Sequence, residues 1–141
     1  MSVHAGVKMS GRYLGQLKTE VTHGPSGTVL KTAAPVDNNG DGSSFSPTDL
    51  VGTALGACML TIMGIVAERD GIDMSQVSFT VEKEMAAQPV RRIGKLTVVF
   101  QMPDGLSEAQ RGKLERAAHT CPVHQSLHPD IELTIIFNYP E

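Results

Sequence analysis

The chain has 141 residues, with 12 basic and 15 acidic side chains and a formal charge of −3. This length suits one domain, and we expect residues 1–141 to form it. Hydrophobic residues make up 40% of the chain and charged residues 19%, which excludes a disordered protein. The mild negative charge argues against nucleic acid as a partner, because binding to phosphates needs a dense basic surface.

The chain contains two cysteines, Cys58 and Cys121. A secreted domain held together by disulfides would need more of them, and the first nine residues lack the segments of a secretory signal. We therefore expect a cytoplasmic protein with no membrane span. In that compartment a cysteine pair is incidental, metal-binding or redox-active.

Strand signals dominate the first third of the sequence. Residues 3–12 and 13–23 alternate loosely, turn formers follow at 23–27, and a β-branched run covers 28–34. This pattern predicts a three-stranded antiparallel meander. Residues 37–46 (DNNGDGSSFS) match the start of a calcium-binding loop, but Thr48 stands where the twelfth position needs Glu, so a polar connection is the preferred interpretation.

A helix from Pro47 to about residue 70 is the clearest predicted element. Ser46 suits the N-cap, Gly71 suits the C′ position, and Asp49 lies in the first turn, where the helix dipole favours an anion. Residues 50–67 carry no charge and are apolar on nearly every face. Such a helix is buried or lies in a membrane, and the soluble character of the remaining chain favours burial.

Glycines inside this helix suggest a close neighbour. Gly52 and Gly56 share a face, and each costs about 1 kcal/mol relative to alanine. The usual compensation is the close approach of another backbone, often a second helix. Because a single domain of this length has little with which to surround a central helix, we expect a second copy of the chain to cover part of it.

After Gly71, hydrophobic residues recur at every second position, which is typical of a strand. Strands are predicted at 77–85 and 91–102, and Ser107 caps a helix that runs to about residue 119. Cys121, with Pro122 in the first helical position, begins a short second helix, and residues 131–137 form the last strand. The element order is βββ–α–ββ–αα–β, which is typical of the α+β class.

The cysteines and nearby histidines are the candidates for chemistry. Free cysteine often acts as a small core hydrophobe, which suits Cys58. Cys121 has polar neighbours in the sequence, and a helix N-terminus lowers the pKa of a thiol. Metal binding is the competing hypothesis. Its candidate ligands for zinc are His119, Cys121, His124 and His128, together with Cys58. The sequence around them lacks the paired CxxC motifs of structural zinc sites and a carboxylate that would orient the ligands.

The sequence resembles the OsmC/Ohr family of osmotically induced and organic hydroperoxide resistance proteins, and its divergent OsmC-like branch in particular. The matching features are the stretch from Ser46 to Cys58 (SPTDL to LGAC), the pair Cys121–Pro122, the run YLGQL at 13–17 and the closing strand. The resemblance covers nearly the whole chain. It implies an intertwined homodimer whose central helices pack at the dimer core, and we expect no cofactor.

The resemblance also implies a thiol-dependent peroxidase of oxidative-stress defence. Cys58 would attack the O–O bond of an organic hydroperoxide and become a sulfenic acid. Cys121 would condense with it to a disulfide, which an external dithiol would reduce.

One part of the family pattern is missing. The family's peroxidases carry a Glu ten residues before the first cysteine, and this Glu holds an Arg that stabilises the thiolate. This chain has Thr48 at that position and no Arg between residues 19 and 67. The candidate substitutes are Asp49 for the acid and Arg12 for the guanidinium, followed by Arg91 and Arg92.

Two other functions stay open at this point. One is a non-catalytic dimer that binds an apolar small molecule in an interface pocket, with both cysteines as core residues. The other is a metal-binding protein that uses residues 119–128.

Overall fold

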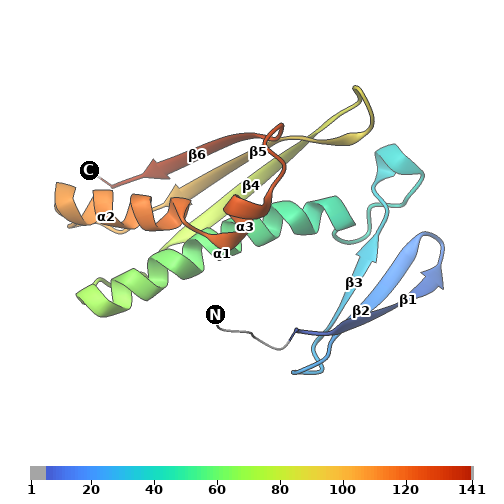
Figure 1. Ribbon diagram of the computed structural model, residues 1–141, viewed down its shortest axis with the longest axis horizontal. Helices are drawn as coiled ribbons and strands as arrows, with labels where there is room; N and C mark the ends of the chain where they lie inside the picture. The colour runs from blue at the N-terminus through green and yellow to red at the C-terminus, as the bar shows by residue number, and fades with distance from the viewer. Residues whose placement is uncertain (1–5, 141) are drawn as a thin grey trace. The chain divides into compact units, whose positions relative to one another are not determined.

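The computed structural model describes residues 6–140, which fall into two compact units that divide between Leu50 and Val51. The first unit holds β1 (Met9–Gly15), β2 (Lys18–His23), β3 (Val29–Ala33), the 3-10 turn η1 (Val36–Asn38) and the start of α1 (Pro47–Asp70). The second holds the rest of α1, β4 (Ser78–Ala86), β5 (Arg92–Gln101), α2 (Glu108–His119), α3 (Pro122–Ser126) and β6 (Glu132–Asn138). This order confirms the predicted α+β class (Figure 1).

The first unit contains the predicted antiparallel meander, in the order β1–β2–β3. Its first turn comes later than predicted, at Gly15, Gln16 and Leu17, which have φ angles of 91°, 55° and 61°. The sequence indicated a break at residues 12–13, because Gln and Leu are unusual in left-handed turn positions. The predicted start of the first strand, at residues 3–5, lies outside the described part of the chain.

Helix α1 begins and ends where the sequence predicts. The Ser46 hydroxyl accepts a hydrogen bond from the Asp49 N–H (3.1 Å), and the Asp49 carboxylate accepts one from the Ser46 N–H (2.9 Å). Gly71 ends the helix with a φ of 69°. These two ends determine the length of the helix and place Cys58 at its middle.

The second unit contains a three-stranded sheet with β5 at its centre, antiparallel to β4 and parallel to β6. The parallel pairing requires a crossover, which α2 and α3 provide. Phe100 of β5 pairs with Phe79 on one side and with Phe137 on the other, with ring centroids 6.0 and 5.4 Å apart. This aromatic row forms part of the sheet face that packs on the helices.

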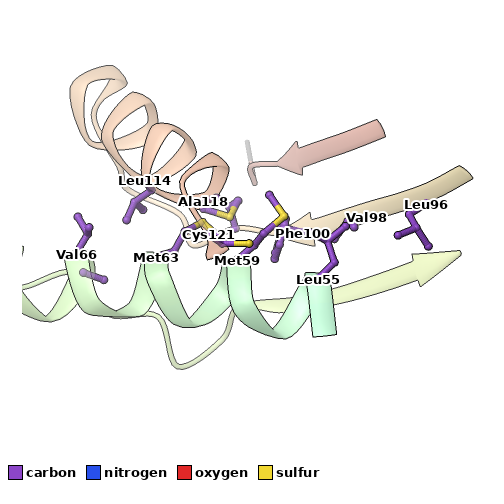
Figure 2. Close-up of a cluster of buried hydrophobic side chains, with 12 residues drawn as sticks. Leu55, Met59, Met63, Val66, Leu96, Val98, Phe100, Leu114, Ala118 and Cys121 are labelled. Carbon is purple, nitrogen blue, oxygen red and sulfur yellow. The ribbon is translucent and has the colours of Figure 1, made fainter. Parts of the chain in front are cut away.

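The core of the second unit lies between this sheet and the helices (Figure 2). In β5 every second side chain from Leu96 to Phe100 is fully buried, as expected for a strand with one face on the core. The buried side chains labelled in Figure 2 are Leu55, Met59, Met63 and Val66 from α1, Leu96, Val98 and Phe100 from β5, Leu114 and Ala118 from α2, and Cys121.

The glycines of α1 allow close contact with the sheet rather than with a second helix. A Cβ atom added at Gly56 would lie 2.6 Å from Cδ2 of Phe79, and one added at Gly52 would lie 3.1 Å from Cγ1 of Val81. The prediction of a close neighbour is therefore right, but in the described residues the neighbours are side chains of β4 and β5.

Much of α1 remains uncovered by its own chain. The helix is long and apolar enough to cross a membrane by length and composition, a test that the core helix of a soluble protein also passes, and 39% of its most apolar stretch is buried. Ala54, Ala57, Thr61 and Ile65 are exposed and recur every three or four residues along one stripe. The prediction that a second copy of the chain covers part of this helix stays a prediction, and the exposed stripe is the surface that such a copy would cover.

Candidate active site

Cys121 occupies the N-cap of α3, with Pro122 in the first helical position, as predicted. Its sulfur accepts a hydrogen bond from the backbone N–H of His124 at 3.2 Å. The side chain is 0% exposed and belongs to the apolar core. The expectation of polar surroundings is therefore wrong, because Ala118 and the α1 side chains cover the sulfur even though its sequence neighbours are polar (Figure 2).

The pKa of the Cys121 thiol is raised above its ordinary value, mainly because burial disfavours the thiolate. A hydrogen bond from the backbone of His124 opposes this shift, and a weaker one from Val123 acts in the same direction. The expectation that a helix start would lower the pKa of Cys121 is wrong in its net direction, because the effect of burial exceeds that of these backbone hydrogen bonds.

The structure brings Cys58 and Cys121 together. Interaction with the Cys58 side chain also raises the pKa of Cys121, so the two thiols lie close enough to interact. Both cysteines are free thiols. They differ in access, because Cys58 is partly exposed whereas Cys121 is buried. A partly accessible thiol with a second thiol behind it is the arrangement needed for reversible disulfide chemistry.

The candidate guanidiniums are engaged elsewhere in their own units. Arg12 belongs to the first unit and pairs with Glu20, with Nη2 and Oε1 3.1 Å apart. Arg92 donates from Nε to the carbonyl of Gln88 (3.2 Å) and from Nη1 to that of Ile93 (3.5 Å). A role for Arg12 or Arg92 beside Cys58 therefore stays a prediction.

Asp49, the candidate acid, has a capping role in the first unit. Its carboxylate and its N–H both bond to Ser46, which forms a reciprocal cap on α1. The neighbouring Thr48, at the family's Glu position, has its hydroxyl 3.2 Å from that of Ser46. Both residues thus contribute to the start of the helix that carries Cys58.

The histidine cluster does not assemble into a metal site. Among residues 6–140, no group of three or more His, Cys, Asp or Glu side chains is placed to hold a metal ion. The rings of His119 and His124 meet edge to face with centroids 5.7 Å apart, whereas His128 accepts a hydrogen bond from the N–H of Asp130. The spacing in sequence suggested four ligands, but the turn after α3 separates His128 from the others.

The loop that resembles a calcium site uses its acid in an ion pair. Asp41 lies 2.9 Å from Nζ of Lys18 and accepts a hydrogen bond from the N–H of Ser43. The bonds from Lys18 and Ser43 lower the pKa of Asp41 to about 2. The polar-connection interpretation therefore agrees with the structure.

Two further features have no counterpart in the sequence analysis. Arg111 lies over the ring of Tyr139 at 4.2 Å, and the Tyr139 hydroxyl donates to Glu115 at 2.7 Å, which joins α2 to the end of the chain. A cavity of about 570 Å³ opens between residues 71–76 and 101–110, and neither cysteine lines it. Both features form where segments that are distant in the sequence meet. No pattern within either segment predicts such a meeting.

Comparison with known proteins identifies relatives of this chain. A family model described as OsmC, OsmC-like protein, matches residues 40–136. A crystal structure from Psychrobacter arcticus 273-4, assigned to osmotic stress induction and the detoxification response, is 38% identical over 98% of both chains, with a TM-score of 0.86. No curated protein matches the chain at a significant level.

More distant structures share the fold. The organic hydroperoxide resistance protein OsmC of Legionella pneumophila is 22% identical with a TM-score of 0.73, over 97% of this chain and 99% of that one. A Vibrio cholerae protein assigned to organic hydroperoxide resistance is 18% identical with a TM-score of 0.75, over 98% and 94% of the two chains. That structure has captopril bound in one of its active sites.

Proposed function

The chain belongs to the OsmC-like family, and from this premise we propose that it is a thiol-dependent peroxidase that reduces organic hydroperoxides in oxidative-stress defence. The observation that carries the proposal is the proximity of the Cys58 and Cys121 thiols in one apolar cluster, although the two residues come from distant parts of the chain. Two cysteines used only for packing would have no need to meet.

The reaction uses the two thiols in sequence. The Cys58 thiolate attacks one oxygen of the hydroperoxide, the O–O bond breaks, and the products are a Cys58 sulfenic acid and an alcohol. The Cys121 thiol then displaces water from the sulfenic acid and forms the disulfide. An external dithiol reduces this disulfide and is itself oxidised to a cyclic or protein disulfide. Cys58 acts first because it is partly exposed, whereas Cys121 is buried and holds its proton more strongly than an ordinary thiol.

An organic rather than a small polar peroxide suits the surroundings of Cys58. Its side chain packs against the apolar core cluster, together with Leu60 and Ile62 of the same helix. An alkyl or aryl group gains free energy when it leaves water for such a surface. The captopril in the Vibrio cholerae relative supports a small organic molecule as the occupant of the corresponding site. We place the protein in the cytoplasm, where dithiol reductants are available.

The proposal includes a homodimer built on α1. The exposed stripe of Ala54, Ala57, Thr61 and Ile65 is apolar or nearly so, and Ile65 alone is 49% exposed. A second copy of the same helix would cover it. Substitution of Ile65 by Glu would place a charge in that interface, and we expect a loss of dimer in sedimentation velocity experiments. An Ile65→Glu variant that sediments like a wild-type dimer contradicts this part of the proposal.

The activity is tested with cumene hydroperoxide as substrate and dithiothreitol as reductant. Wild-type protein should consume the hydroperoxide catalytically, and Cys58→Ser should lose turnover by at least about 10²-fold, because the only accessible sulfur nucleophile is gone. Cys121→Ser should consume about one equivalent per chain in a single turnover and accumulate a sulfenic acid that dimedone labels.

Ala109→Ser provides the matched control, because it adds the same hydroxyl at an exposed position on α2. This variant should retain wild-type turnover. Retention of wild-type turnover by Cys58→Ser would instead remove the basis of the proposal. The non-catalytic alternative is then favoured, and native mass spectrometry of the purified protein would reveal a bound ligand.

A further inference from the structure

The two sulfurs of the pair differ in their environments. Cys58 is partly exposed on α1, whereas Cys121 is 0% exposed and lies beneath the apolar side chains of the core. The Cys121 sulfur also accepts a hydrogen bond from the His124 N–H at 3.2 Å, and the backbone of Val123 provides a further donor. No corresponding backbone donor is available in the middle of α1, where N–H groups bond within the helix.

We infer that an external thiol reduces the Cys58–Cys121 disulfide by attack on the Cys58 sulfur, and that Cys121 is the leaving group, held by the backbone N–H groups of Val123 and His124. This inference rests on the proposed function, but only through the disulfide. It assigns the site at which the reductant forms its mixed disulfide and gives two backbone groups a role in regeneration of the enzyme.

The exchange step has defined changes at each atom. The thiolate of the reductant forms a bond to Cys58 Sγ, the Sγ–Sγ bond breaks, and its electron pair moves to Cys121 Sγ. The two N–H groups stabilise that negative charge as it develops. Cys121 then takes up the proton that the reductant has lost. The second thiol of the reductant attacks its own sulfur in the mixed disulfide and releases Cys58.

Access to the two sulfurs favours this direction over the reverse one. An attacking thiolate must approach a sulfur in line with the S–S bond, and the buried Cys121 offers no such path from solvent. Burial raises the pKa of Cys121 and so disfavours a thiolate there, and the hydrogen bonds from the backbone offset part of that cost as Cys121 departs.

The first test maps the mixed disulfide. Diamide, rather than a hydroperoxide, forms the Cys58–Cys121 disulfide, so the test does not depend on peroxidase activity. The oxidised protein is treated with 2-mercaptoethanol, quenched in acid, alkylated and digested for mass spectrometry. We expect the mercaptoethanol adduct on Cys58 and the alkyl group on Cys121. An adduct on Cys121, an equal mixture, or failure of diamide to link the two residues would overturn the inference.

The second test separates the backbone donor from the side chain of His124. His124→Pro removes the N–H within the first turn of α3, where proline is tolerated, and His124→Ala keeps the N–H but removes the ring. Loss of one hydrogen bond to the leaving thiolate should slow reduction of the diamide-formed disulfide about three- to tenfold in His124→Pro. His124→Ala should stay within about twofold of wild type. Equal slowing in both variants, or no slowing in His124→Pro, would overturn the role of the N–H.

If hydroperoxide turnover is absent but the adduct maps to Cys58, the proposed function fails and this inference stands. If turnover is normal but the adduct maps to Cys121, the proposed function stands and this inference fails.

Discussion

Replacement of Gly56 by alanine tests the packing of α1 on the sheet that supports the cysteine pair. The new Cβ would lie 2.6 Å from Cδ2 of Phe79 and 3.0 Å from Cγ2 of Val81. The Phe79 ring has little freedom to retreat, because it packs against Phe100, which itself stacks on Phe137. Overpacking of this kind costs about 1–3 kcal/mol, whereas alanine improves helix propensity by about 1 kcal/mol. We expect a net destabilisation of roughly 1 kcal/mol.

Gly64→Ala is the matched comparison on the same helix. No atom lies within 4 Å of a Cβ added there, so only the gain in helix propensity of about 1 kcal/mol should remain. The two variants should therefore differ by about 1–3 kcal/mol in the free energy of unfolding, with opposite signs relative to wild type.

Urea denaturation followed by circular dichroism measures this difference. A gap of about 2 kcal/mol corresponds to roughly 1 M urea in the midpoint for a chain of this size. All variants are compared at the same protein concentration, because unfolding of a dimer depends on concentration. If Gly56→Ala is as stable as Gly64→Ala, the close contact with Phe79 does not determine the packing of this helix. If the contact does, Phe79→Leu in the Gly56→Ala background should restore part of the loss.

Three further predictions concern α2, the end of the chain and Cys121. Ser107→Ala removes a reciprocal cap with Gln110 and should lower the free energy of unfolding by about 1 kcal/mol; no change in the urea midpoint would contradict this. Tyr139→Phe removes the 2.7 Å hydrogen bond to Glu115 and should cost about 1–2 kcal/mol by the same assay, and an unchanged free energy of unfolding would contradict this. The raised pKa of Cys121 contributes stability that is present below the unfolded thiol pKa of about 8.5 and is lost as the pH rises through the higher folded value. Between pH 8 and 10, wild-type protein should therefore lose stability more steeply than Cys121→Ala, and parallel pH profiles would refute this.

The elements with strong local signals were predictable from the sequence. Both ends of α1 follow from Ser46 and Gly71, and the start of α3 follows from Cys121 and Pro122, because caps depend on neighbouring residues. The first hairpin was misplaced because its turn uses Gln16 and Leu17 in left-handed conformations that these residues rarely adopt.

The environment of the candidate site was less predictable. The sequence shows polar residues on both sides of Cys121, but burial depends on side chains from α1 that lie more than fifty residues earlier. The meeting of Cys58 and Cys121 was expected only from the family resemblance, since no local pattern encodes it. The neighbours of Gly56 were likewise hidden, because the register of β4 and β5 determines which side chain faces it.

The crossover that carries Cys121 also affects how the protein is made. Cys121 lies between α2 and α3 in the crossover from β5 to β6, so the ribosome must add all of α2 before the second sulfur exists. Translation at about 5–20 residues per second adds the 63 residues from 59 to 121 in about 3–13 seconds. During that interval the nascent chain holds Cys58 without its partner. Under the proposed function, a sulfenic acid formed at Cys58 on the ribosome closes to the disulfide only after Cys121 has been added.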